Sequence, residues 1–222
     1  GKVIADAAKQ QAKQRLGGMV LAGSMDKVRI ETTSVASQLD SFSRYLMGSV
    51  KGQFVSELLQ DAVARGDKPS VVLEYTADSV SEFVIGDQLG ALTAASDGVV
   101  VAGHPNIGDV VKRFAHKAMT FKAVDGLGNA HEFRVAGFDG WLERFLAEVD
   151  DARLEDLRVN VFDRTREAAE ALGMTFEDIT GRKYEFRTGE NGEVRAFLRD
   201  KPQTADAVAR YNSGQTDILG LN

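Results

Sequence analysis

Cysteine is absent from this chain, and histidine is scarce. Among 222 residues there is no thiol, which excludes a disulfide framework, a thiolate nucleophile and a Cys-based zinc or iron–sulfur site. The histidines are His104, His116 and His131, and no two of them have the i, i+3 or i, i+4 spacing that places two ligands on one helix face. No serine stands in a Gly-x-Ser-x-Gly elbow. The sequence therefore predicts no metal site, no cofactor and a protein that is not an enzyme.

Long apolar runs are lacking as well. Charge or glycine interrupts every apolar stretch before the roughly 18 to 20 residues that a membrane helix needs, although an apolar content of 43% is enough to form a core. Residues 1–14 also lack the apolar centre of a secretory signal. With the missing cysteines, these features predict a cytoplasmic protein that has no membrane partner.

The net charge of −6 is unevenly distributed. Residues 1–66 hold nine Lys and Arg against six Asp and Glu, and residues 67–222 hold 18 against 27. An acidic bulk repels a polyanion at long range, so a nucleic-acid surface is expected to be local and confined mainly to the N-terminal part.

The residue pattern predicts an α+β protein with an N-terminal strand-helix-helix module followed by a mixed helix and β-hairpin domain. The best linker is Asp67-Lys68-Pro69. It divides the chain into a helical arm and linker at 1–25, the module at 26–66 and an acidic α+β domain at 67–222. The elements expected in the acidic domain are strands at 71–75 and 99–102, helices at 79–95, 107–117, 138–149 and 154–172, hairpins at 120–135 and 183–199, and a tail with one short helix and a polar end.

Within the module, polar and apolar residues alternate from Lys27 to Glu31, the period of a half-buried strand. Apolar residues at helical spacing follow, after an N-cap at Thr33 or Ser34. Met47-Gly48-Ser49 is expected to break this helix, and a second helix then ends at Gly66. The apolar faces of the two helices are Val35, Leu39, Phe42 and Leu46, and then Phe54, Val55, Leu58, Leu59, Ala62 and Val63.

This order of a short strand, a helix, a short break and a second helix resembles the ribbon-helix-helix family of DNA-binding proteins. The resemblance covers residues 26–66. It implies a homodimer in which two strands form a ribbon that enters the major groove of DNA. Lys27, Arg29 and Glu31 would then face the bases. The dimer core would consist of Val28, Ile30, Phe42, Leu46 and Phe54.

The stretch from Val50 to Val55 resembles the start of the second helix in that family. The resemblance places Ser49 and Lys51 beside a DNA phosphate. Two departures are visible: the break carries one residue more than the usual turn, and Glu31 puts an acidic side chain on the reading face. The predicted function is therefore that of a transcriptional regulator or a replicon-maintenance protein. Its acidic C-terminal domain is available for a protein partner.

Other interpretations stay open. Residues 26–66 could be an αα-hairpin in the core of a protein-interaction or scaffold protein without DNA binding. Residues 165–199 could form a helix-turn-helix with a basic wing, and the turn before Ile107 could hold an anion at a helix N-terminus. The twelve carboxylates from Asp139 to Asp178 alternate with five arginines, which favours a solvated helix face over a catalytic or cation-binding cluster.

Overall fold

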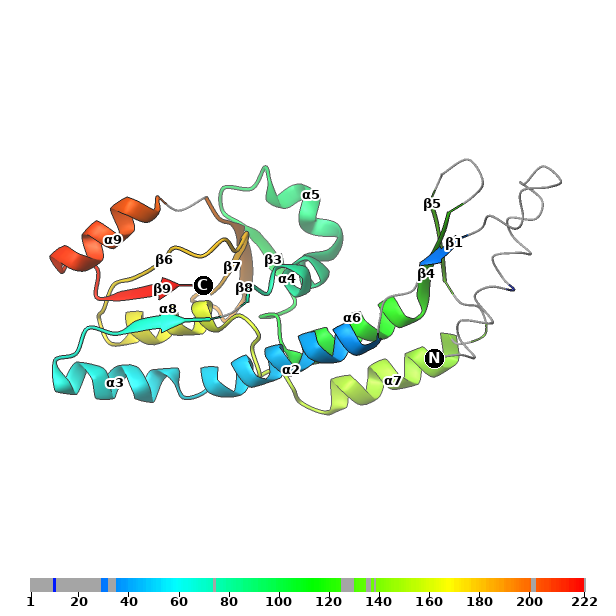
Figure 1. Ribbon diagram of the computed structural model, residues 1–222, viewed down its shortest axis with the longest axis horizontal. Helices are drawn as coiled ribbons and strands as arrows, with labels where there is room; N and C mark the ends of the chain where they lie inside the picture. The colour runs from blue at the N-terminus through cyan, green and yellow to red at the C-terminus, as the bar shows by residue number, and fades with distance from the viewer. Residues whose placement is uncertain are drawn as a thin grey trace. The chain divides into compact units, whose positions relative to one another are not determined.

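The computed structural model describes residues 10, 29–31, 35–73, 75–124, 130–134, 137, 139–200 and 203–221. The chain forms two compact units (Figure 1). The first unit consists of Gly1–Phe42 and Val111–Ala152, and the second of Ser43–Val110 and Arg153–Asn222. These boundaries differ from those expected after residues 25 and 66, because both units are built from two separate stretches of chain.

The first unit contains an antiparallel sheet in the order β1-β4-β5. Its strands are β1 (Arg29–Glu31), β4 (Thr120–Val124) and β5 (Ala130–Arg134). The helical part combines the start of α2 (Val35–Gly52), the end of α6 (Ile107–Ala118) and α7 (Asp139–Asp151). Its core is formed by Ala115 and Met119 against Leu142 of α7, which is 1% exposed, with Phe145 and Leu146 packed around them.

The second unit is built on two three-stranded sheets (Figure 1). A parallel sheet has the order β2-β9-β6, and an antiparallel sheet has the order β3-β8-β7. The strands are β2 (Ser70–Val72), β3 (Val99–Val101), β6 (Phe176–Asp178), β7 (Tyr184–Thr188), β8 (Val194–Leu198) and β9 (Ile218–Leu221). The end of α2 and the start of α6 belong to this unit. Its other helices are α3 (Val55–Arg65), α4 (Asp78–Ile85), a 3-10 turn (Gly86–Gln88), α5 (Leu89–Leu92), α8 (Val161–Ala171) and α9 (Thr204–Ser213).

Helices α3 and α8 cover the parallel sheet. Val55 and Leu59 of α3 meet Ala169 of α8 and Ile218 of β9 in one buried cluster. A parallel connection needs a crossover long enough to hold a helix, and here α8 precedes β6 and α9 precedes β9. Ligands of such sheets bind outside the carboxyl ends of the strands. A ligand site in this unit is therefore expected near the carboxyl ends of β2, β9 and β6.

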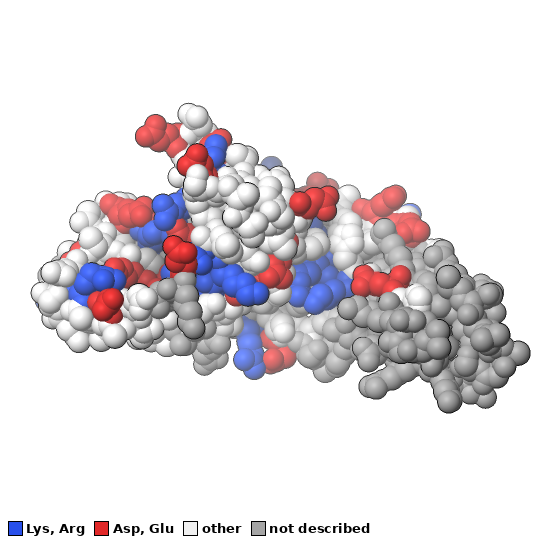
Figure 2. All heavy atoms as spheres, turned by 90° about the horizontal axis from the view of Figure 1, so that it is seen from above, with Lys and Arg blue, Asp and Glu red and all other residues white. Residues whose placement is uncertain are grey.

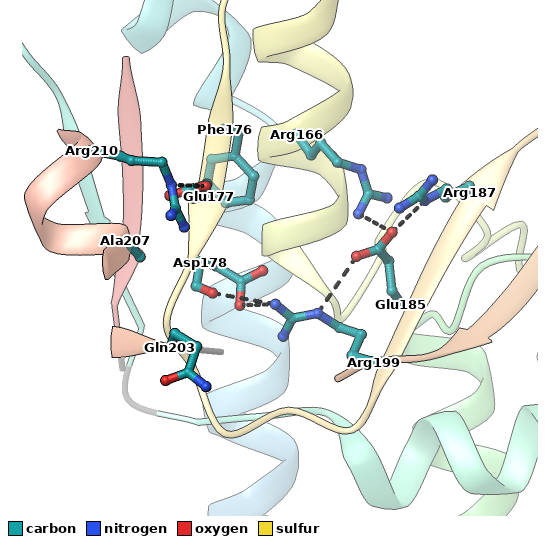
Figure 3. A pocket seen from close by; sticks show the side chains of 10 residues that line it. All are labelled: Arg166, Phe176, Glu177, Asp178, Glu185, Arg187, Arg199, Gln203, Ala207 and Arg210. Atoms are coloured by element: carbon teal, nitrogen blue, oxygen red, sulfur yellow. Dashed lines mark hydrogen bonds and ion pairs between the residues drawn. The ribbon is translucent and has the colours of Figure 1, made fainter. Parts of the chain in front are cut away.

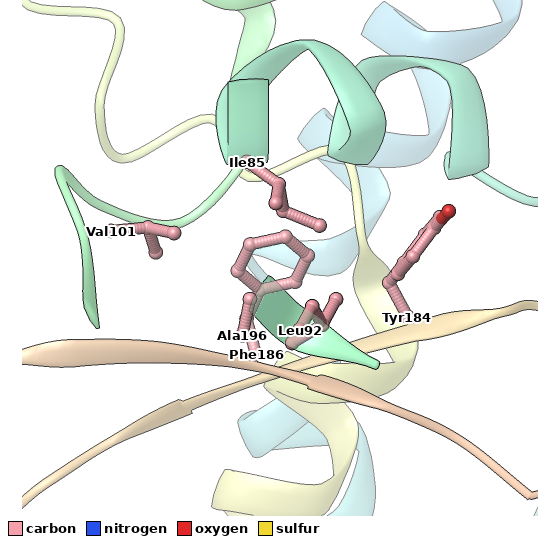
Figure 4. Packing of buried hydrophobic residues seen from close by; sticks show 6 residues of the cluster. All are labelled: Ile85, Leu92, Val101, Tyr184, Phe186 and Ala196. Carbon is pink, nitrogen blue, oxygen red and sulfur yellow. The ribbon is translucent and has the colours of Figure 1, made fainter. Parts of the chain in front are cut away.

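The antiparallel sheet packs against α4 and α5 (Figure 4). Phe186 and Ala196 are fully buried in this cluster, together with Ile85 of α4 and Leu92 of α5. Alternation along β7 places Phe186 inward and Arg187 outward, where its side chain is 60% exposed. One face of this sheet therefore belongs to the core and the other carries charged side chains.

The predicted mixture of helices and strands is confirmed, as are both hairpins, the helix from Ile107 and the end of a helix at Gly66. Residues 154–160 are not helical, although a helix was expected there. Residues 176–178 form β6 in place of the helix of a winged domain, and the tail expected to be polar contributes the central strand of the parallel sheet. No helix in the described part of the chain is both long and apolar enough to cross a membrane.

Candidate nucleic-acid interface

The predicted reading strand is only partly described. Lys27 and Val28 lie outside the described residues, whereas Arg29, Ile30 and Glu31 form β1. This strand pairs antiparallel with β4 of the same chain, with Arg29 opposite Val124. The resemblance had implied pairing with a second subunit. Among the described strands none pairs with the other edge of β1, so a second copy could add only at that edge.

The predicted dimer-core residues on the helices lie in different environments. Phe42 and Leu46 are half-buried, and the Phe42 ring meets Phe114 edge to face with centroids 6.4 Å apart. Phe54 is 51% exposed. Of the three, Phe54 is therefore the side chain with the most surface left for a partner.

Helix α2 continues through the predicted break and ends at Gly52. Gly48 lies inside the helix, and glycine suits this position because a side chain there would collide with the Tyr75 hydroxyl. The Tyr75 ring packs edge to face on Tyr45 at 5.0 Å. Ser49 is fully buried and its hydroxyl donates a hydrogen bond to the Tyr45 carbonyl oxygen at 2.8 Å. The glycine thus permits a close approach, and the Ser49 hydroxyl is directed away from the surface on which a phosphate would lie.

Lys51, the other predicted phosphate contact, lies at the surface and lines a cavity of about 410 Å³. We call it the α2–β2 cavity, because its wall consists of α2 and the residues at the carboxyl end of β2. Arg44 lies on the same face of α2 as Lys51, about two helical turns away. The lining residues are Ser43, Arg44, Met47, Gly48, Lys51, Val72, Leu73 and Tyr75.

The chemistry of the α2–β2 cavity suits a ligand with an anionic part and an apolar part. Arg44 and Lys51 supply positive charge, and Met47 and Val72 supply exposed apolar surface, 57% and 65% exposed. Burial raises the pKa of Tyr75 to about 12, so its hydroxyl stays neutral. Lys51 has a structural role too, because a cation in the last turn of a helix stabilises the helix dipole.

A second feature of the second unit is a buried ionic network around Arg182, which sequence reasoning missed. The guanidinium is 2% exposed and lies 2.5 Å from Asp163 Oδ1 and 2.7 Å from Asp178 Oδ2. Burial raises the pKa of Asp163 despite the neighbouring arginines. Although burial acts on Asp178 in the same direction, Arg182 and Arg199 hold the pKa of that carboxyl below its ordinary value. The acidic stretch is therefore not only a solvated face, since these two carboxylates are part of the core.

The basic residues of the alternative winged interpretation are largely paired. Arg182 is buried, and Arg195 donates to Glu193 at 2.6 Å. On the face drawn in Figure 2, basic and acidic side chains lie next to one another over the described surface. A nucleic-acid surface there would have to be local, because neighbouring carboxylates reduce the long-range attraction of a phosphate.

The turn before α6 is closed by its own side chains. The Asn106 backbone N–H donates to Asp109 Oδ2 at 3.0 Å, and the Asp109 backbone N–H donates to Asn106 Oδ1 at 3.2 Å. This reciprocal cap uses backbone donors that an anion would need, and it places a carboxylate at the helix N-terminus. The alternative interpretation of this turn as an anion site is therefore not supported.

His104, in the same turn, is buried among ionisable groups. Its Nε2 lies 2.9 Å from Thr188 Oγ1 and 3.5 Å from Glu167 Oε1. The Nδ1 atom has no partner among the described residues. Burial lowers the pKa of His104 to about 4, and the charge of Arg158 acts in the same direction. The histidine is thus neutral in the fold near pH 7. Its arrangement differs from that of a catalytic triad, because Thr188 and Glu167 both lie at Nε2, whereas the acid of a triad lies at Nδ1.

In the described part of the chain, no three His, Asp or Glu side chains come together in a way that could hold a metal ion. Comparison with known proteins gives no match, whether with protein-family models, with curated proteins or with solved structures. The function of this chain is therefore inferred from the chemistry of its own sites.

Proposed function

We propose that the protein binds DNA, and that the α2–β2 cavity holds part of the sugar-phosphate backbone. The observation that carries the proposal is that Lys51 and Arg44 line one cavity at the carboxyl end of a parallel strand. Arginine and lysine supply most of the charged contacts to DNA phosphates. Neither Asp163 nor Asp178 lines this cavity. Lys51 and Arg44 can therefore attract a phosphate locally, although the protein as a whole is acidic.

The apolar part of the cavity supports contact with one strand in particular. A volume of about 410 Å³ can accept a single nucleotide but not a DNA duplex. Proteins that bind single strands combine positive charge along the backbone with apolar and aromatic contacts to the bases. Met47 and Tyr75 supply such contacts beside Lys51.

The first test replaces Lys51 with glutamine. We expect a lower affinity for all DNA sequences alike, and a salt dependence weaker by about one ion, because a phosphate contact carries no base information. A binding titration with an oligonucleotide at two salt concentrations measures both effects. Lys183→Gln is a matched control, since this exposed lysine also lies in the second unit but does not line the cavity. Equal losses for the two variants would contradict the proposal.

The homodimer is the second part of the proposal. Phe54 is exposed and continues a row of apolar side chains on α2 and α3, with Val50 at 41% and Leu58 at 62% exposure. Large contiguous apolar patches on a protein surface mark interaction sites. In the ribbon, the edge of β1 that no described strand pairs with would pair with the same edge in the other subunit.

The prediction is a dimer in sedimentation equilibrium at micromolar concentration, which Phe54→Asp dissociates because a charge would be buried in the interface. Gln60→Asp on the exposed side of α3 serves as the control. A monomeric wild-type protein would remove the ribbon. The cavity proposal would then stand alone, since Lys51 does not depend on a second subunit.

A further inference from the structure

Two cavities of the second unit differ in how their polar groups are satisfied. One of them, of about 250 Å³, lies between β6 and α9, and there Arg210 Nε donates to Glu177 Oε1 at 2.8 Å (Figure 3). In the same wall, Arg199 Nη2 lies 2.8 Å from Asp178 Oδ1. These charges are largely balanced within the chain. The α2–β2 cavity is different, because one of the donors in its wall, the Tyr75 hydroxyl, has only a long hydrogen bond.

The Tyr75 hydroxyl is weakly held by the fold. It lies 3.5 Å from the Tyr45 carbonyl oxygen, which is the outer limit of a hydrogen bond. The same carbonyl oxygen already accepts a bond of 2.8 Å from the Ser49 hydroxyl. Because burial raises the pKa of Tyr75 to about 12, the hydroxyl keeps its proton and does not repel an anion. A ligand can therefore take over this donor at little cost to the folded state.

Gly48 sets the position of the hydroxyl. A side chain at position 48 would collide with the Tyr75 hydroxyl oxygen, so this oxygen occupies nearly the place of a Cβ atom on α2. Both residues line the α2–β2 cavity. Lys51 follows three positions later on α2, and side chains with this spacing begin about 5 to 6 Å apart on one face of a helix. A phosphate that Lys51 binds is thus within reach of the Tyr75 hydroxyl.

We propose that the Tyr75 hydroxyl donates a hydrogen bond to the DNA phosphate that Lys51 holds, and that it positions this phosphate over Gly48. This inference rests on the function proposed for the cavity. A lysine ammonium attracts a phosphate as a point charge on a flexible stem, so it does not fix the position of the phosphate. The hydroxyl supplies that position, because its ring packs on Tyr45. The attached nucleoside then has the exposed apolar surface of Met47 beside it.

Tyr75→Phe tests the proposal, since it removes the hydroxyl and keeps the ring. We expect the affinity for a single-stranded thymidine oligonucleotide to fall about tenfold, the effect of one hydrogen bond to a charged group. The salt dependence should stay unchanged, because a neutral donor releases no counterion. Lys51→Gln should instead reduce the salt dependence by about one ion. Fluorescence anisotropy of a labelled oligonucleotide at two salt concentrations measures both quantities.

Tyr184→Phe is the matched control. Tyr184 belongs to the second unit too, and its hydroxyl donates to Glu82 Oε1 at 3.1 Å, but it does not line the cavity. Its replacement should leave the affinity for the oligonucleotide unchanged. The melting temperature of Tyr75→Phe should match that of the wild type, because the bond that the variant loses within the chain is long.

The outcomes separate this inference from the proposed function. If Lys51→Gln loses affinity as expected and Tyr75→Phe does not, the role of the hydroxyl is overturned and the cavity still binds DNA. If neither variant changes the affinity, both proposals fail. Equal losses for Tyr75→Phe and Tyr184→Phe, or a loss that accompanies a lower melting temperature, would show that the Tyr75 hydroxyl supports the fold and not the ligand.

Discussion

Replacing Arg182 with alanine is expected to reduce the free energy of unfolding by about 3 to 5 kcal/mol. The guanidinium is 2% exposed and forms ion pairs with Asp163 and Asp178, whose side chains are 0% and 3% exposed. Without Arg182 two buried carboxylates lose their principal countercharge, and both the lost hydrogen bonds and the uncompensated charge destabilise the folded state. Chemical denaturation with urea measures the change.

Two further variants separate charge from packing at this position. Arg195→Ala removes a surface ion pair with Glu193 and should change stability by less than about 1 kcal/mol. The double variant Arg182→Met, Asp163→Asn removes one charge of each sign and leaves Asp178 paired with Arg199 at 2.8 Å, so it should recover part of the loss. An Arg182→Ala protein as stable as Arg195→Ala would show that the network contributes little to stability.

The elements that could be predicted from sequence are those formed by residues close together in the chain. Asn191-Gly192 marks the turn of the β7–β8 hairpin, and Gly192 has the positive φ of 77° that favours glycine. Gly66 ends α3 in the left-handed conformation with φ of 72°. In both cases one residue type is required by a local backbone geometry. The local residue pattern alone therefore locates both turns.

The parallel sheet could not be predicted in the same way. Its strands contain three or four residues, and β2 pairs with β9, which lies at the other end of the chain. A short apolar run such as Ile218–Leu221 has no periodicity that separates a buried strand from other structures. Asp163 poses the same difficulty, because its partner Arg182 is 19 residues away. Only the fold brings these groups together.

The candidate site was found in part. The resemblance to a helix start singled out Ser49 and Lys51, but both lie inside α2, where residues two positions apart point in nearly opposite directions. One is therefore buried against Tyr45 and the other lines the α2–β2 cavity. Arg44 and Tyr75 also line the cavity, but no sequence motif marked either residue as part of a site. Arg44 would have been found by helical spacing once Gly48 was recognised as a site of close packing and not as a break.

A second large effect is expected from pH, through His104. Burial lowers the pKa of this imidazole to about 4 in the fold, with Arg158 acting in the same direction, Glu167 opposing it and Arg166 adding to it. In the unfolded chain the pKa returns to about 6.5. Between these values the unfolded state binds a proton that the folded state does not, so the free energy of unfolding falls as the pH is lowered. Over this window His104 should account for about 3 kcal/mol, at about 1.4 kcal/mol per pH unit.

His104→Gln isolates this contribution from the titration of the carboxylates. The amide can keep a hydrogen bond to Thr188 but takes up no proton, so the variant should lose stability less steeply than the wild type between about pH 6.5 and pH 4.5. The lowered pKa of Asp178 and the raised pKa of Asp163 have opposite effects on stability in acid, and both remain in the variant. Urea unfolding at four or five pH values gives the two slopes. Parallel slopes would mean that His104 is protonated in the fold, and that its imidazolium is stabilised by Glu167 at 3.5 Å more strongly than burial disfavours it.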